Sequence, residues 1–389
     1  MRFSLLLLGG FIASAFAGHS HSSSKSHHPR PLPKSDPESD HKSDSSSDSH
    51  PASGGCNFTT ADTAMQHKSS CSTIVLNNVK VPAGKTLDLT KLKDGTTVIF
   101  KGVMTFGYAE WLGPLITISG NGLTIEGDAG HCINGQGRRY WDGKGGNGGK
   151  KKPKLLALHN VHDSIVQNLN IKDTPVQAVS INTVTNLLVK DVHIDSSLGD
   201  KLGGHNTDGF NVGKVDGLVI DGAVVENQDD CVAINSGKNI TFTNGHCSGG
   251  HGVSIGSVGN KSSNVVENVL ISKTMIENSE NAIRIKTIAG ATGFVTDVTY
   301  EDITLRDIDK YGMVFRQDYL NGGPTQQPTK GVPMTGIRIK NVTGTVKPAG
   351  KNIFILCANC KDWTFTNIDI TGGQSKEKCV GVPAGAFCA

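Results

Sequence analysis

The sequence has few of the features that mark a membrane-spanning or nucleic-acid-binding protein. Beyond residue 17, no apolar run approaches the roughly 20 residues that a transmembrane helix requires. The formal net charge is only +3, and part of it lies in the first 55 residues, so the charge does not indicate a nucleic-acid partner. Proline is also scarce, at 14 of 389 residues, whereas glycine is abundant at 48. This composition favours a chain with many tight turns.

The N-terminus predicts secretion. Arg2 supplies a positive charge, residues 3–16 are mostly apolar, and Ala15-Phe16-Ala17 has the small-x-small pattern of a cleavage site. The apolar stretch is too short to cross a bilayer comfortably. We therefore predict a cleaved signal peptide over residues 1–17 and a secreted, extracellular protein without a membrane anchor.

Residues 18–55 differ sharply in composition from the rest of the chain. They are mainly Ser, His, Asp, Lys and Pro, so they cannot bury enough apolar surface to offset the entropy of ordering. We predict a disordered leader or pro-segment. Metal binding is the alternative, but the histidine spacing matches no ligand geometry, and we expect no metal or cofactor. The histidines are His19, His21, His27, His28, His41 and His50.

Nine cysteines follow the predicted signal peptide, so disulfides are expected. Their spacing suggests local pairs and leaves Cys132 unpaired as a small buried side chain. The Cys357-x-x-Cys360 pattern also occurs in redox proteins, but a structural bridge suits a secreted chain better. The predicted pairs are Cys56 with Cys71, Cys231 with Cys247, Cys357 with Cys360, and Cys379 with Cys388. Sequons at Asn57, Asn239, Asn260 and Asn341 predict glycosylation.

Short β-rich runs recur along the chain, each interrupted by Asn, Asp or Gly. Examples are NLNIKD ending at Asp173, LLVKDVHID at 187–195 and IRIKNVTGTV at 337–346. The step from Ile171 to Ile194 is 23 residues. Alternating apolar residues and a repeat of roughly 20 to 35 residues without a helical period predict a solenoid of strands. We therefore predict an all-β fold, the parallel β-helix, with Asn side chains stacked at its corners; a propeller would need longer, four-stranded repeats.

The segment from Cys56 to Cys71 precedes the first repeat. Its apolar residues lie at roughly helical spacing, and Thr59 or Thr60 is positioned to cap a helix. Because a solenoid needs its open end covered, we predict a short N-terminal capping helix held by the first disulfide.

Three polar runs stand apart from the repeat: NTDGF at 206–210, QDDC at 228–231 and GHGVSIGS at 250–257. Asp208 and Asp230 are 22 residues apart, and Asp230 and His251 are 21 apart, which is one coil of the repeat. Residues one coil apart lie nearly above one another, about 4.8 Å apart. The sequence therefore predicts a polar stripe on the outside of the solenoid.

This stripe favours glycosidic hydrolysis. Closely packed carboxylates repel, so at least one should keep its proton at a raised pKa and serve as an acid beside ionised bases. A calcium site or an exposed acidic corner is the alternative. Arg284 and Lys286 point to one face of a predicted strand. They either neutralise the acids or, as we favour, hold the carboxylate of a sugar. Adjacent Asp229 and Asp230 require a bend, which Cys231 is positioned to brace.

Together NTDGF, QDDC, GHGVSIGS and RIK at 284–286 resemble the motifs of the polygalacturonases, glycoside hydrolase family 28. The resemblance runs from about Cys56 to the C-terminus and includes QDYLNGGPT at 317–325. It implies one catalytic domain over residues 56–389 with a right-handed parallel β-helix. It also implies hydrolysis, with inversion, of α-1,4-galacturonosyl linkages in pectin or polygalacturonate.

The resemblance also implies a role for individual residues. Asp229 resembles the general acid, Asp208 and Asp230 resemble the pair that activates water, and His251 would tune and reset the acid. The implied substrate-binding residues are Asn206, Arg284, Lys286 and Tyr319. Two positions depart from the family pattern: Asn211, where many relatives have Asp, and Arg316, where a neutral residue is commoner. We expect Arg316 to add a contact to a polyanion.

Within the family, moderate loop lengths and the Arg284/Lys286 pair favour endo action on unesterified galacturonan. An exo-polygalacturonase and a rhamnogalacturonan or xylogalacturonan hydrolase are alternatives with the same fold. A pectate lyase would need metal-ligating acids in place of this series, and a non-catalytic polysaccharide-binding solenoid would need no stacked acids. Nothing in the sequence indicates an oligomer, so we expect a monomer.

Overall fold

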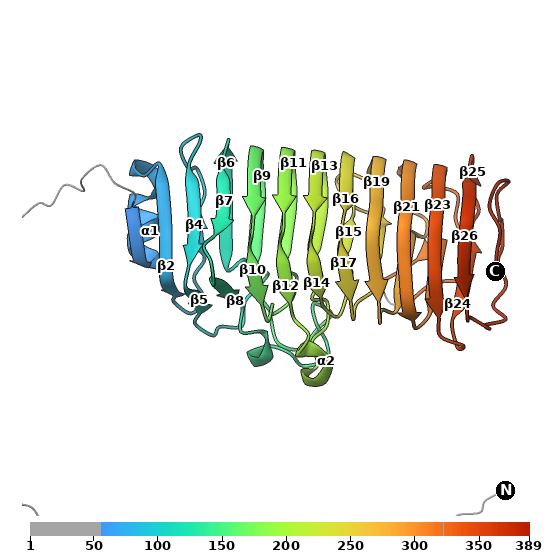
Figure 1. Cartoon of the computed structure of the whole chain (residues 1–389), viewed down its shortest axis with the longest axis horizontal. Helices are drawn as coiled ribbons and strands as arrows, with labels where there is room; N and C mark the ends of the chain where they lie inside the picture. The colour runs from blue at the N-terminus through green and yellow to red at the C-terminus, as the bar shows by residue number, and fades with distance from the viewer. Residues whose placement is uncertain (1–55, 322) are drawn as a thin grey trace, which may run out of the picture. The chain divides into compact units, whose positions relative to one another are not determined.

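The structure, a computed structural model, describes residues 56–321 and 323–389. The predicted signal peptide and leader, residues 1–55, lie outside the described residues. In the described part, every pair of named strands is parallel, and the strands stack coil upon coil from β2 to β26 (Figure 1). The predicted all-β fold, a parallel β-helix, is confirmed. None of the described helices is long and apolar enough to cross a membrane.

Three rows of paired strands form the faces of the helix in the described residues, and several long strands pass from one row into another. The long strands are β2 (Thr73–Val81), β9 (Leu156–Gln167), β11 (Val179–Lys190), β13 (Phe210–Asp221), β19 (Val265–Glu277), β21 (Phe294–Ile308) and β23 (Met334–Val346). The first row also contains β3 (Leu87–Leu89), β6 (Ile116–Asn121), β15 (Val232–Ile234), β18 (Val253–Val258), β20 (Asn281–Ile288), β22 (Tyr311–Tyr319) and β24 (Lys351–Leu356).

The other two rows are completed by shorter strands. The second contains β1 (Cys56–Thr60), β4 (Thr97–Lys101), β7 (Thr124–Gly127), β16 (Gly237–Thr243), β25 (Cys360–Lys361) and β26 (Thr364–Thr371). The third contains β5 (Val103–Phe106), β8 (Cys132–Asn134), β10 (Asn170–Lys172), β12 (His193–Asp195), β14 (Val224–Glu226) and β17 (His246–Ser248). The helices are α1 (Ala61–His67), α2 (Gly199–Leu202), η1 (Lys68–Ser70) and η2 (Gly137–Arg139).

The register follows the predicted repeat. Ile171 of β10 pairs with Ile194 of β12, which confirms the step of one coil. Along each strand, side chains alternate between the interior and the surface. The inward residues form one continuous core along the helix, with Phe242, Tyr300 and Phe315 among its fully buried side chains.

Asparagine and aspartate side chains stack at the corners, as predicted. Asn239 donates its amide Nδ2 to Asp216 Oδ1 at 2.7 Å, and Asn268 donates to Asn239 Oδ1 at 2.7 Å. Asn239 and Asn268 both have positive φ, a conformation that asparagine adopts more readily than most residues. The ladder therefore satisfies the polar groups of the corner while turning the chain.

The predicted capping helix is α1. Thr60 caps it by accepting a hydrogen bond from Thr63 N at 3.3 Å, and the helix begins at the following residue. The Cys56–Cys71 disulfide encloses the helix. The other three predicted disulfides are present, and Cys132 is unpaired but half-buried rather than buried. Three of the sequon asparagines are exposed and Asn341 is half-buried, so glycosylation stays a prediction.

Candidate active site

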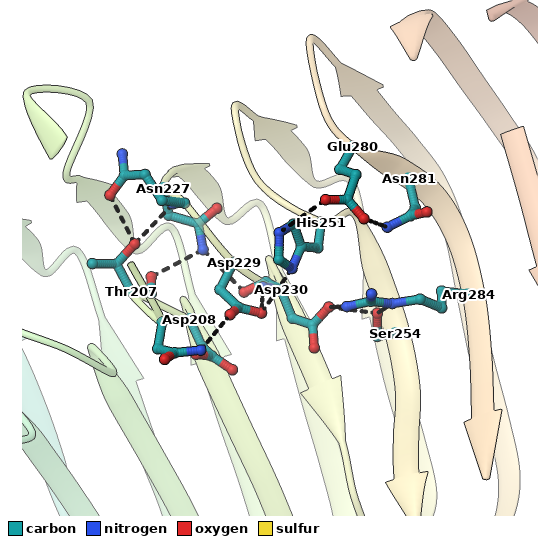
Figure 2. Close-up of polar contacts among 12 residues, drawn as sticks. Thr207, Asp208, Asn227, Asp229, Asp230, His251, Ser254, Glu280, Asn281 and Arg284 are labelled. Atoms are coloured by element: carbon teal, nitrogen blue, oxygen red, sulfur yellow. Dashed lines mark hydrogen bonds and ion pairs between the residues drawn. The ribbon is translucent and has the colours of Figure 1, made fainter. Parts of the chain in front are cut away.

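The three polar runs meet at the N-terminal ends of neighbouring strands in the first row. Phe210 of β13 pairs with Val232 of β15, which pairs with Val253 of β18. Asp208 and Asp230 each lie two residues before these paired positions, and His251 lies two before Val253. The coil spacing thus brings together the residues that the sequence analysis singled out, as the close-up shows (Figure 2).

A bend separates the two adjacent aspartates. Residues 228–231 precede β15 and are not part of a strand, so the carboxylates of Asp229 and Asp230 face the same site. Asn227 holds the bend: its Nδ2 donates to the carbonyls of Thr207 at 2.9 Å and Asp230 at 3.0 Å. Cys231, bonded to Cys247, follows directly. The predicted bend is confirmed, and Asn227 is a supporting residue that the sequence analysis did not single out.

Asp229 is surrounded by hydrogen-bond donors. Asn206 Nδ2 donates to Asp229 Oδ2 at 2.7 Å. Asp229 Oδ1 accepts from the backbone N of Asp230 at 2.7 Å and lies 3.1 Å from His251 Nδ1. The other ring nitrogen of His251 lies 3.7 Å from Glu280. The carboxylate of Asp229 is therefore fixed at both oxygens.

Asp230 contacts the basic pair. Lys286 Nζ donates to Asp230 Oδ2 at 3.0 Å, Arg284 donates to Asp230 Oδ1, and Ser254 Oγ donates to the same oxygen at 2.6 Å. Arg284 Nε also donates to Ser254 at 2.9 Å. Both cations point to one face of β20, as predicted, but in the described site they pair with Asp230. The sequence analysis assigned no role to Ser254, which lies in the GHGVSIGS run. The strand register explains its position, because Ser254 of β18 pairs with Arg284 of β20.

Asp208 is the aspartate of the cluster whose pKa is raised. Burial and the negative charges of Asp229 and Asp230 raise the pKa of Asp208 well above its ordinary value. Asn211 donates its amide Nδ2 to Asp208 Oδ2 at 2.7 Å. Asn211, where many relatives have Asp, thus gives the Asp208 carboxyl group a neutral hydrogen-bond donor. The sequence analysis expected a raised pKa on at least one of the acids, and Asp208 is the one that has it.

Asp229 and His251 behave as a charged pair. Burial alone would raise the pKa of Asp229, but the His251 hydrogen bond and nearby positive charges lower it. Burial would likewise lower the pKa of His251, but the hydrogen bond and the charge of Asp229 outweigh it and raise the pKa. The imidazolium of His251 and the carboxylate of Asp229 therefore stabilise one another.

A cavity of about 640 Å³ lies over the three aspartates. Asn206, Lys286 and Tyr319 line it, while Arg284 and His251 do not line it but contact the acids. Lys286 Nζ lies 5.3 Å from the centre of the Tyr319 ring. Four exposed lysines line the cavity as well: Lys150, Lys151, Lys154 and Lys261. The three aspartates therefore line a cavity that also contains several lysines, and these positive charges suit a polyanion.

Arg316 differs from its prediction. Its side chain is 9% exposed and forms two hydrogen bonds to Asp318, with Nε to Oδ1 at 2.7 Å and Nη2 to Oδ2 at 3.1 Å. It also packs over the Phe354 ring at 5.7 Å. Because Asp318 neutralises the guanidinium inside the protein, the expected contact with a polyanion is wrong.

Comparisons with known proteins agree with this geometry. Residues 71–388 match the family model of the glycosyl hydrolases family 28. The chain belongs to this family. As a family 28 enzyme it is a glycoside hydrolase, and the parallel β-helix of family members of known structure matches its own.

Several similar relatives are fungal. The chain is 55% identical over 339 residues to a polygalacturonase of Cochliobolus carbonum, covering 87% of this chain and 93% of the relative. It is 54% identical to endopolygalacturonase 1 of Colletotrichum lindemuthianum, with the same coverage. Among solved structures, endopolygalacturonase I of Stereum purpureum, complexed with two galacturonates, has 35% identity and a TM-score of 0.74. That match covers 82% of this chain and 95% of the other.

Proposed function

We propose that this family 28 hydrolase is a secreted endopolygalacturonase that cleaves α-1,4-galacturonosyl linkages in pectin or polygalacturonate with inversion. One observation carries the proposal: three aspartates from adjacent coils line a cavity that is also lined by lysines. Such a site offers an acid and a base to the glycosidic bond, and cations to the polymer. The relatives named as endopolygalacturonases support the choice of substrate and endo action.

In the proposed reaction, Asp229 donates a proton to the glycosidic oxygen as the bond to the anomeric carbon breaks. Water attacks that carbon from the opposite face and passes a proton to Asp208 or Asp230. Because the pKa of Asp229 is lowered in the free site, it needs a proton source. His251 lies one hydrogen bond away and has a raised pKa, so we infer that it supplies the proton to Asp229.

Asp208 must be ionised before it can accept a proton from water. Its raised pKa therefore sets a lower limit to the pH of activity. Arg284 and Lys286 would share the carboxylate of a bound galacturonate with Asp230, and Asn206 and Tyr319 would contact the sugar from the cavity wall.

Asp229→Asn tests the proposed acid. Reducing-end release from polygalacturonate should fall by about 10²- to 10⁴-fold, the usual contribution of a general acid, while substrate binding persists. Asp216→Asn is the matched control, since Asp216 is an exposed aspartate of the corner ladder and its replacement keeps the acceptor oxygen. An active Asp229→Asn variant would mean that another group protonates the leaving oxygen.

Product analysis separates the alternatives. An endo enzyme releases mixed oligomers from long polygalacturonate at early times, whereas an exo enzyme releases only monomers or dimers. A pectate lyase would instead produce an unsaturated bond that absorbs in the ultraviolet and would be blocked by a chelator. Chromatography of early products from polygalacturonate, rhamnogalacturonan and xylogalacturonan therefore tests both the mode of attack and the substrate.

The remaining parts of the proposal concern the whole protein. Secretion rests on the N-terminal signal-like sequence and on four disulfides, which form in oxidising compartments. A right-handed coil follows the general preference of parallel crossover connections. We further infer that the enzyme acts as a monomer, that residues 18–55 form a leader, and that the sequons are glycosylated.

A further inference from the structure

A glycine-rich loop, residues 144–149, lies between η2 and β9 and lines the cavity above the aspartates. Its backbone is fixed at both ends by one carboxylate. Asp142 accepts from the backbone N of Lys144 at 3.0 Å and from that of Lys150 at 2.9 Å. Lys152 Nζ, from a side chain only 1% exposed, pairs with Asp142 at 2.8 Å. The loop therefore has a defined position over the site.

The tip of the loop contacts Asn206. The backbone N of Gly146 donates to Asn206 Oδ1 at 3.0 Å, and Asn147 Nδ2 donates to the same oxygen at 3.3 Å. A backbone N–H can only donate, so the atom that faces it must be the amide oxygen. The amide nitrogen of Asn206 is then directed to Asp229 Oδ2, at 2.7 Å.

Gly145 allows this close approach. It has a φ of +54°, and a Cβ added there would lie 2.3 Å from Asn206 Oδ1 and 2.7 Å from the carbonyl oxygen of His205. No side chain fits at these distances without displacing Asn206. Gly143, just before the loop, has a φ of +75° but nothing within 4 Å of an added Cβ. The steric requirement for glycine at residue 145 thus comes from Asn206 and the adjacent His205 carbonyl, and residue 143 has no such requirement.

We propose that the glycine-rich loop is a positioning element of the active site: it fixes the Asn206 amide and, through it, the orientation of Asp229. The inference rests on the proposed role of Asp229 as the acid. Asn206, predicted as a substrate-binding residue, is then also a positioning residue, and Asn147 is a second one. Neither needs to touch the glycosidic oxygen.

The positioning role predicts a change in the pH profile. The Asn206 donor favours the ionised form of Asp229, so its displacement should raise the pKa at which the Asp229–His251 pair loses its proton. The alkaline limb of kcat/KM should therefore move to higher pH. None of the other charged groups around the Asp229–His251 pair is altered in this test: Asp208, Asp230, Arg284, Lys286 and Glu280, which lies 3.7 Å from His251.

The experiment compares Gly145→Ala with Gly143→Ala on polygalacturonate. Gly145→Ala should lower kcat by about 10- to 100-fold, because a displacement of about 1 Å at a reacting group can cost about 10²-fold. Its alkaline limb should move upward, and any rise in KM from the displaced Asn206 should be smaller than the fall in kcat. Gly143→Ala introduces the same kind of left-handed strain without the contact, so its kcat, KM and pH profile should match those of the wild type.

Asn147→Ala removes one donor to Asn206 without adding an atom and keeps the inference testable if Gly145→Ala does not fold. Asn147→Ala should lower kcat and move the alkaline limb upward, each by less than Gly145→Ala does. Asn147→Gln should restore part of the lost kcat. Wild-type pH profiles in Gly145→Ala and Asn147→Ala would overturn the loop's role while leaving the proposed function intact. Activity in Asp229→Asn would instead overturn the role of Asp229, so the two failures are distinguishable.

Discussion

The buried ion-pair network around Asp230 should stabilise the fold independently of catalysis. Asp230 is 2% exposed, and the side chains of Arg284 and Lys286 are 12% and 8% exposed. At the 3.0 Å between Lys286 Nζ and Asp230 Oδ2, and with an effective dielectric constant of about 20, the attraction is about 5 kcal/mol before desolvation. Asp230→Asn removes the anion and leaves both cations buried, with an amide N–H₂ where one oxygen was.

The expected loss of unfolding free energy for Asp230→Asn is about 3–5 kcal/mol, the usual cost of breaking a buried ion pair. Lys286→Met removes one of the stranded cations. The double variant should therefore lose less than the sum of the two single variants, by about 1–3 kcal/mol. Equilibrium urea unfolding at one fixed pH, with the disulfides oxidised, measures all four proteins.

The exposed Asp216–Lys238 pair provides the matched cycle. Its atoms are 3.3 Å apart, but the side chains are 47% and 52% exposed, so its coupling energy should be only about 0–1 kcal/mol. A coupling at Asp230–Lys286 no larger than at this surface pair would refute the claim that burial makes the network strong.

Two further predictions concern pH and the disulfide beside the acids. The raised pKa of His251 contributes stability that is fully present below its unfolded value of about 6.5 and is lost as pH rises through the folded pKa. The difference in unfolding free energy between wild type and His251→Ala should therefore shrink on going to alkaline pH, and a constant difference would contradict the Asp229 pairing. Replacing Cys231 and Cys247 by Ala opens a loop whose ends are 16 residues apart and should cost about 3 kcal/mol in urea unfolding. It should also lower kcat, because Cys231 follows the bend; unchanged kcat would mean that Asn227 holds the bend alone.

Much of the fold could be predicted because the β-helix is built from a repeating sequence pattern. A one-coil spacing is visible in the sequence, and it fixes which residues stack, as the pairing of Ile171 with Ile194 shows. The same spacing predicted that Asp208, Asp230 and His251 would meet. The disulfides could be predicted because each joins cysteines that lie close together in the sequence.

The features that escaped prediction depend on side-chain direction and on long-range contacts. The pattern could not show that Arg316 turns toward Asp318 rather than toward the cavity, because a residue type does not fix a rotamer. Nor could it show that Asp208, rather than Asp229, has the raised pKa. That difference arises from which carboxyl group receives the His251 hydrogen bond, a property of geometry rather than of spacing.

The charges of the cluster explain how an acidic site accommodates an acidic polymer. The aspartates lie beside His251, whose pKa is raised, and beside Arg284 and Lys286, which both pair with Asp230. Each cation already has a carboxylate partner, so a galacturonate must share Arg284 and Lys286 with Asp230 rather than find them free. In the proposed reaction, this sharing would draw Arg284 and Lys286 away from Asp230 and so couple binding of the sugar's charge to activation of water.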